Sequence, residues 1–249
     1  MFPIKDNIPT DRFPVVTLAL IVVNVVVFFF WQQPSGFSGV DDVKVVEYGA
    51  IPYELTHPGQ HCAIAGAQLV CGELPTDDPP TWTTVFASMF MHGGILHLAG
   101  NMLFLWIFGN NIEDAMGHVK FVLFYLLGGI AALAGQVLFD PNAAIPTIGA
   151  SGAVAAVLGG YILLYPRARV LTLIFIVFFV TIIEIPAVIM LGLWFVQQAF
   201  FAARDLSDPL GGGGGVAYWA HVGGFVFGLV AIRLLATRRK EPEPRHPVY

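Results

Sequence analysis

Residues 119–139 read VKFVLFYLLGGIAALAGQVLF, an apolar run with a single charge, Lys120. The hydrocarbon core of a bilayer is about 30 Å thick, and a helix of about 20 apolar residues crosses it. Similar runs lie outward from this one on both sides: 95–112 and 150–165 first, then 13–31, 185–203 and 217–236. The sequence therefore predicts an all-α, polytopic membrane protein with six transmembrane helices.

The composition agrees with this prediction. Of the 249 residues, 56% are hydrophobic and 12% are charged, and the mean hydropathy is +0.73; a soluble domain carries about 25% charged residues. The net charge of -5 comes from acidic residues scattered over loops, so it gives no sign of a nucleic-acid partner. The first run, 13–31, is too long for a signal-peptide core and is expected to remain as the first helix.

Lysine and arginine predict the orientation. With the N-terminus inside, only Lys44 and Arg204 fall outside, and ten basic residues fall inside. The inside set is Lys5, Arg12, Lys120, Arg167, Arg169, Arg233, Arg238, Arg239, Lys240 and Arg245. We therefore expect a cytoplasmic segment 1–12, a membrane domain 13–236 with an outside loop 32–81, and a charged cytoplasmic tail 237–249 that is disordered.

Three other segments need an interpretation. Residues 170–183 are apolar but short for a span, and we expect an interfacial or re-entrant segment. Cys62 and Cys71 share the outside loop, where a disulfide is expected; free thiols, or a metal site with His57 and His61, are the alternatives. The five glycines 211–215 predict a mobile connection, which together with the end of the fifth helix could admit substrate.

Strongly polar residues inside membrane spans are rare, and each requires a reason. His97 and Asn101 lie in the second helix, just after His92; Ser151 begins the fourth helix and His221 the sixth. In the predicted topology all three helices begin at the outer face. We therefore expect these side chains at a similar depth in the outer half of the bilayer.

Small residues at helical spacing should let two of these helices approach closely. They are Ser151, Ala155 and Gly159 on the fourth helix and His221, Gly224 and Gly228 on the sixth. Faces of small residues allow the backbones of membrane helices to come near contact. If the two faces meet, Ser151 and His221 come within hydrogen-bonding reach.

Such a pair supports nucleophilic chemistry. A serine hydroxyl needs a neighbouring base, and histidine exchanges protons near neutral pH. His97 and Asn101, one turn apart, could donate hydrogen bonds to an oxyanion, together with free backbone N–H groups at the start of the fourth helix. The outer parts of the spans contain no acidic residue to orient His221, so the expected arrangement is a Ser-His dyad.

Three strings resemble the signatures of rhomboid intramembrane serine proteases. They are HGGILHLAGN (His92 to Asn101), GASG (Gly149 to Gly152) and AHVGGFVFG (Ala220 to Gly228), which match HxxxxHxxxN, GxSG and AHxxGxxxG. All three occur in the family's order and on its second, fourth and sixth helices. The resemblance covers about residues 13–236.

The resemblance implies a role for each of these residues. Ser151 would be the nucleophile, His221 the general base, and His97 and Asn101 the oxyanion donors. His92, Gly149 and Gly152 would support the site, and Gly224 and Gly228 would pack the helices.

It also implies an endopeptidase, without cofactor or metal, that cleaves transmembrane segments of other membrane proteins. The enzyme would lie in the lipid bilayer of a bacterial plasma membrane, with its site open to the outside. The alternatives are a non-catalytic rhomboid-like protein that binds membrane clients and, from the polar groups alone, a transporter or proton relay.

This chain departs from the family pattern at two positions. Many members carry Trp-Arg in the loop before the second helix, whereas Trp82 here precedes Thr83. Some members place a Tyr one turn after the serine, against the histidine, where this chain has Ala155. The sequence does not show which residue orients His221.

Overall fold

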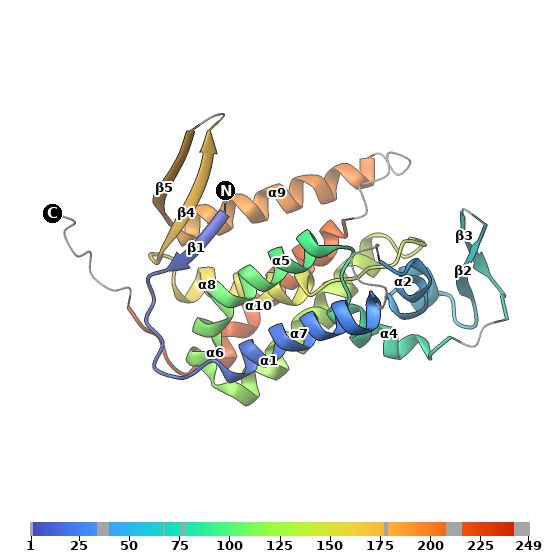
Figure 1. Cartoon of the computed structure of the whole chain (residues 1–249), viewed down its shortest axis with the longest axis horizontal. Coiled ribbons are helices and arrows are strands. Elements are labelled where there is room, and N and C mark those ends of the chain that lie inside the picture. The colour runs from blue at the N-terminus through green and yellow to red at the C-terminus, as the bar shows by residue number, and fades with distance from the viewer. Residues whose placement is uncertain are drawn as a thin grey trace.

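The computed structural model describes residues 2–33, 40–66, 68–75, 78–176, 179–207 and 216–241. Within these residues, five apolar helices are long enough to cross a membrane: Val15–Gln32, Ile95–Met116, His118–Phe139, Ala187–Asp205 and Tyr218–Leu235. A shorter apolar helix, Ser151–Leu164, lies among them. The protein is an integral membrane protein built as a helical bundle (Figure 1).

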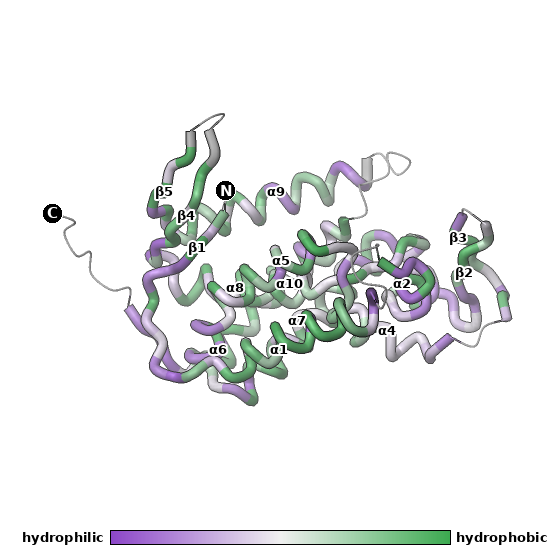
Figure 2. The backbone as a smooth tube through the Cα atoms, in the orientation of Figure 1, coloured by the Kyte–Doolittle hydropathy of each residue, from purple (hydrophilic) through white to green (hydrophobic). Residues whose placement is uncertain are grey.

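The six expected helices are all present, with ends shifted by four residues at most. In chain order they are α1 (Val15–Val26) continued by the π-helical η1 (Val27–Gln32); α5 (Ile95–Phe104) continued by the π-helical η3 (Leu105–Gly109) and by α6 (Asn110–Met116); α7 (His118–Phe139); α8 (Ser151–Leu164); α9 (Ala187–Ser207); and α10 (Tyr218–Leu235). Figure 2 shows hydrophobic residues along α1, α5 and α7, and hydrophilic residues near α6 and around α2.

Helix α8 forms the centre of the bundle, and its residues 152–161 are all buried. Glycine lets α10 approach it: a Cβ added to Gly224 would lie 2.1 Å from the carbonyl oxygen of Gly152, and one added to Gly228 would lie 2.0 Å from that of Ala156. The expected contact between these helices is therefore present. It runs through the expected Gly159, where an added Cβ would lie 2.1 Å from the carbonyl oxygen of Phe225, and through Gly152 and Ala156, one residue along from the expected Ser151 and Ala155.

Of residues 170–183, the described ones lie in two antiparallel strands, β4 (Arg169–Ile176) and β5 (Phe179–Pro186). The N-terminal strand β1 (Phe2–Asp6) pairs antiparallel with β4, so the sheet order is β1-β4-β5. The segment does not form a spanning helix, and the sheet itself was not predicted. A short apolar run rich in β-branched residues suits a strand, but its partner β1 lies far away in the sequence.

The long loop between the first two spans carries two short helices, α2 (Asp42–Tyr48) and α3 (Pro52–Thr56), and the hairpin of β2 (His61–Ala65) and β3 (Gln68–Gly72). A disulfide joins Cys62 to Cys71 across this hairpin. The chain then enters α4 (Thr81–Ala87) and the short 3₁₀ helix η2 (Ser88–Phe90) before α5.

The same loop is hydrogen-bonded to the segment that leads into α8. Ala50 and Thr147 exchange two backbone hydrogen bonds, of 3.2 and 2.8 Å, and Tyr53 N–H donates to the carbonyl of Ala143. A side chain at Gly49 would collide with Pro146. The long loop therefore positions the chain segment that precedes Ser151.

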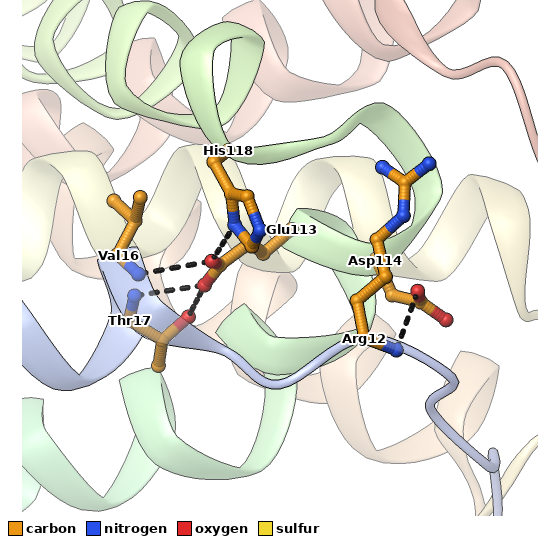
Figure 3. A network of polar contacts seen from close by, with 6 residues as sticks. All are labelled: Arg12, Val16, Thr17, Glu113, Asp114 and His118. Atoms are coloured by element: carbon orange, nitrogen blue, oxygen red, sulfur yellow. Dashed lines mark hydrogen bonds and ion pairs between the residues drawn. The ribbon is translucent and has the colours of Figure 1, made fainter.

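A carboxylate network fastens the opposite end of the bundle (Figure 3). Glu113 is fully buried and accepts hydrogen bonds from the N–H groups of Val16 and Thr17, from the Thr17 hydroxyl, and from His118 Nδ1. These N–H groups belong to the first turn of α1, where helical partners are missing. Glu113 therefore caps α1 from α6.

Asp114 binds residues near both described ends of the chain. It accepts hydrogen bonds from the backbone N–H groups of Asp11 and Arg12, and Lys240 Nζ lies 3.1 Å from its carboxylate and 2.7 Å from that of Asp11. Thr237 and Arg238 donate to the carbonyl of Ala115. The expectation of a disordered tail is therefore wrong for residues 237–241, because their polar groups find partners on α6; residues 242–249 lie outside the described residues.

Candidate active site

Ser151 and His221 are in direct contact. Ser151 is the first residue of α8, His221 lies in the first turn of α10, and Ser151 Oγ is 2.8 Å from His221 Nε2. Both side chains line a cavity of about 530 Å³, which is also lined by His97 and Asn101 of α5. The structure therefore brings together the four polar residues that the sequence singled out.

The second ring nitrogen of His221 also has a partner. His221 Nδ1 lies 2.8 Å from Oε1 of Gln198, a residue of α9 that is 7% exposed. The Trp194 ring, one turn earlier on α9, lies 5.8 Å from the imidazole. Sequence reasoning missed Gln198, although Gln197 and Gln198 are the polar pair in an otherwise apolar stretch of the fifth helix.

His97 is exposed at the cavity and has a defined hydrogen-bonding state. The N–H of Gly93 donates to His97 Nδ1 at 3.2 Å, so a neutral ring carries its proton on Nε2. A Cβ added to Gly149 would lie 2.8 Å from Nε2, and φ of Gly149 is +123°. Gly149 therefore leaves room for the Nε2 edge of His97 beside Ser151.

Asn101 is buried at the cavity wall. Its side-chain Nδ2 has no hydrogen-bond partner within the described residues. A buried donor without a partner costs free energy, and it is unusual in a folded protein. Because Asn101 lines the cavity, this amide is a candidate donor to a group bound there.

His92, which the sequence predicted to support the site, packs against His97. It is fully buried, its ring packs edge-on against His97 at a centroid distance of 5.1 Å, and its backbone exchanges two hydrogen bonds with the side chain of Gln32. The Gln32 amide is a second polar contact that sequence reasoning missed. It connects the end of the first span to the turn before α5, which bears His97.

The described residues contain no cluster of three His, Cys, Asp or Glu side chains that could hold a metal ion. The two cysteines, which the sequence left open as metal ligands, are joined to each other.

Comparison with known proteins identifies the family. The Rhomboid domain model matches residues 79–238, which is more than half of the chain. The chain belongs to the rhomboid family. All of the polar residues around the cavity lie inside the matched range.

Several characterised rhomboid proteins are similar in sequence. The chain is 25% identical over 216 residues to the mitochondrial Rhomboid protein 1 of Saccharomyces cerevisiae, covering 85% of this chain and 51% of that protein. It is 28% identical over 146 residues to the Rhomboid protease GluP of Bacillus subtilis, covering 59% and 24%. It is 27% identical over 164 residues to the human mitochondrial presenilin-associated rhomboid-like protein, covering 64% and 35%. The chain thus spans about half or less of the length of these relatives.

Some rhomboids place a tyrosine against the histidine, one turn after the serine, and the surroundings of His221 in this rhomboid differ from that pattern. Ala155, at that position, is fully buried. Two aromatic rings lie near His221: Trp194 of α9 at 5.8 Å, and Tyr218, one turn earlier on α10 itself, at 6.5 Å. The glycines 211–215, expected to help admit substrate, lie outside the described residues.

Proposed function

We propose that this rhomboid is an intramembrane serine endopeptidase that cleaves transmembrane segments of other membrane proteins in the lipid bilayer. The observation that carries the proposal is the 2.8 Å contact between Ser151 Oγ and His221 Nε2 at a cavity inside a bundle of apolar helices. A nucleophile next to a base, with donors nearby, is the arrangement that acyl transfer requires.

The reaction follows from the positions of the groups. His221 Nε2 takes the proton of Ser151 as Oγ attacks the carbonyl carbon of the scissile peptide. The resulting oxyanion receives hydrogen bonds from His97 Nε2, Asn101 Nδ2 and the free N–H groups of the first turn of α8. His221 then gives its proton to the leaving amine, and water hydrolyses the acyl-enzyme by the same steps.

The proposal includes an orientation and a location. Both termini are cytoplasmic, the site opens to the outside, and the membrane is a bacterial plasma membrane. Two arguments support the orientation: Asp114 links residues 11 and 12 to Lys240, so segments near both described ends lie at one end of the bundle, and the predicted topology puts ten of the 12 lysines and arginines of the sequence on that side. Of the three relatives named above, the Bacillus subtilis protein is bacterial and the other two are mitochondrial, so the comparisons favour the bacterial location only through the first.

Loss of the hydroxyl of Ser151 tests the function. We expect Ser151→Ala to abolish both cleavage of a model transmembrane substrate in liposomes and labelling by a fluorophosphonate probe, since both reactions need this nucleophile. Thr83→Ala is the control, because the Thr83 hydroxyl donates to the carbonyl of Pro80 and the residue does not line the cavity. We expect this variant to be labelled like the wild type.

Two results would contradict the proposal. One is undiminished cleavage by Ser151→Ala. The other is a wild-type protein that inserts and folds but is not labelled, while it still binds transmembrane clients; that result would favour a non-catalytic client-binding protein.

A further inference from the structure

The base of the proposed site has a hydrogen-bonding partner on a helix that carries none of the other reacting groups. Gln198 lies on α9, whereas the nucleophile, the base and the oxyanion donors lie on α8, α10 and α5. Its Oε1 is 2.8 Å from His221 Nδ1, and its side chain is buried against α10. Within the described residues, the His221 ring is hydrogen-bonded to Gln198 and to Ser151.

The hydrogen-bond roles at His221 then follow from one another. A neutral imidazole carries one proton, so it donates from one nitrogen and accepts at the other. To act on Ser151, Nε2 must accept the hydroxyl proton, and the ring proton must be on Nδ1. A proton on Nδ1 requires an acceptor at that position, and the amide oxygen of Gln198 is that acceptor.

We infer that Gln198 is the positioning residue of this protease: it holds His221 in the tautomer that leaves Nε2 free for Ser151. The inference rests on the proposed function. When His221 takes the serine proton, the ring becomes a cation and the Nδ1–H···O bond to Gln198 becomes charge-assisted and stronger. Gln198 thus occupies the place that a carboxylate holds in a serine protease triad, with a neutral oxygen that suits an apolar surrounding.

Substitution by methionine tests this role. Gln198→Met keeps the length and shape of the side chain but removes the amide oxygen. We expect kcat to fall about tenfold with KM within about twofold, as for loss of one neutral hydrogen bond that strengthens in the transition state. Gln198→Glu restores an oxygen at the same reach and should recover most of the rate.

The neighbouring glutamine gives a matched control. Gln197 is exposed and lies about 100° around α9 from the buried Gln198, so Gln197→Met makes the same chemical change on the same helix away from His221. We expect kcat and KM of the wild type. The proposal is overturned if Gln198→Met has the kcat of Gln197→Met, or if Gln198→Glu is no faster than Gln198→Met.

The tautomer of His221 can also be observed without turnover. Solid-state NMR of ¹⁵N-histidine-labelled protein in liposomes, with the His221 signals assigned by their loss in His221→Asn, reports which ring nitrogen is protonated. We expect the Nδ1–H form in the wild type and in Gln197→Met, and a growing share of the Nε2–H form in Gln198→Met. Unchanged ring signals in Gln198→Met would overturn the inference.

This readout separates the inference from the proposed function. If the wild type is neither labelled nor active but the tautomer changes in Gln198→Met, the proteolytic function is wrong and the positioning contact stands. If the wild type is active and the tautomer does not change in Gln198→Met, the proteolytic function stands and the inference about Gln198 is wrong.

Discussion

At the scale of single residues, the two proposed oxyanion donors are held in different ways. His97 is fixed by the N–H of Gly93, which occupies Nδ1 and directs the ring proton to Nε2. Asn101 is buried with Nδ2 unpaired within the described residues, and such a donor costs about 1–3 kcal/mol. In the proposed mechanism this cost is recovered when the oxyanion forms.

Replacing Asn101 should therefore separate activity from stability. We expect Asn101→Leu to lower kcat by about 100-fold, the usual effect of losing one oxyanion donor, with little change in KM. The thermal unfolding temperature should be unchanged or higher, because an unpaired buried amide is removed. Steady-state cleavage kinetics and intrinsic tryptophan fluorescence on heating measure the two effects.

The matched control for this prediction is Asn110→Leu. Asn110 lies at the other end of the same helical run, where its side chain accepts the N–H of Asn111. We expect this variant to keep the wild-type kcat. Full activity in Asn101→Leu would exclude Asn101 as an oxyanion donor.

The sequence predicted residues that stand out chemically. Ser151, His221, His97 and Asn101 are conspicuous in apolar helices, and the structure places them around one cavity. Gln198 was missed because hydropathy cannot decide which of two adjacent amides on one helix faces inward, or what it meets there. The contact is between α9 and α10, and only the tertiary structure defines it.

At the scale of elements, the site depends on how closely α8 and α10 pack. Helices in lipid gain no hydrophobic free energy by associating, so close backbone contact through small residues takes its place. Gly224 and Gly228 of α10 lie against the backbone carbonyls of Gly152 and Ala156. The same interface sets the distance between Ser151 and His221.

Adding one methyl group at this interface should weaken both stability and activity. In Gly228→Ala the new Cβ would lie 2.0 Å from the carbonyl oxygen of Ala156, and backbone on both sides cannot yield unless the helices separate. We expect a loss of about 1–3 kcal/mol in the free energy of unfolding, together with lower kcat. Denaturant unfolding in detergent micelles and cleavage assays measure the two.

Gly192→Ala is the matched control on α9. A Cβ there meets no atom within 4 Å, and alanine favours a helix over glycine by about 1 kcal/mol. This variant should be as stable as the wild type or more so. If Gly228→Ala behaved like Gly192→Ala, the α8–α10 contact would not be as close as the structure has it.

The elements that sequence predicted and those it missed differ in the range of their interactions. Six apolar runs were long enough to predict six helices, because a bilayer forces each to satisfy its own backbone hydrogen bonds. The β1-β4-β5 sheet was missed, since β4 pairs with residues 2–6 at the far N-terminus. Residues 237–241 were missed for the same reason: their partners, Ala115 and Asp114, lie on α6.

At the scale of the whole molecule, α8 connects the proposed active site to a polar network at the other end of the bundle. Ser151 begins this helix, and Tyr161 lies near its end. The Tyr161 hydroxyl donates to Asp6 Oδ2 at 2.5 Å, and Asn111 Nδ2 donates to the same oxygen at 2.6 Å. Asp6 ends β1, so one carboxyl joins the N-terminal strand, α6 and α8.

Asp6 should make stability depend on pH. Burial raises the pKa of its carboxyl from 3.8 to about 6, against the opposing effect of the Tyr161 hydrogen bond. A carboxyl whose pKa is higher in the folded than in the unfolded state favours folding when protonated. Its contribution is therefore complete below about pH 4 and is lost as the pH rises through about 6. The loss amounts to about 2–3 kcal/mol at pH 8.

Asp6→Asn isolates this effect, because the amide has the shape of the carboxyl and keeps an oxygen acceptor but does not ionise. We expect the wild type and Asp6→Asn to unfold at similar temperatures at pH 4.5, and the variant to be the more stable at pH 8. Every other titrating group is common to the two proteins, so the difference between their unfolding temperatures reports Asp6 alone. A difference that stays constant from pH 4.5 to 8 would show that Asp6 does not change its ionisation in this range. If the difference in unfolding temperature grows with pH, and Asp6→Asn cleaves substrate as fast as the wild type at each pH, the hydrogen bonds around Asp6 stabilise the fold independently of the chemistry at Ser151.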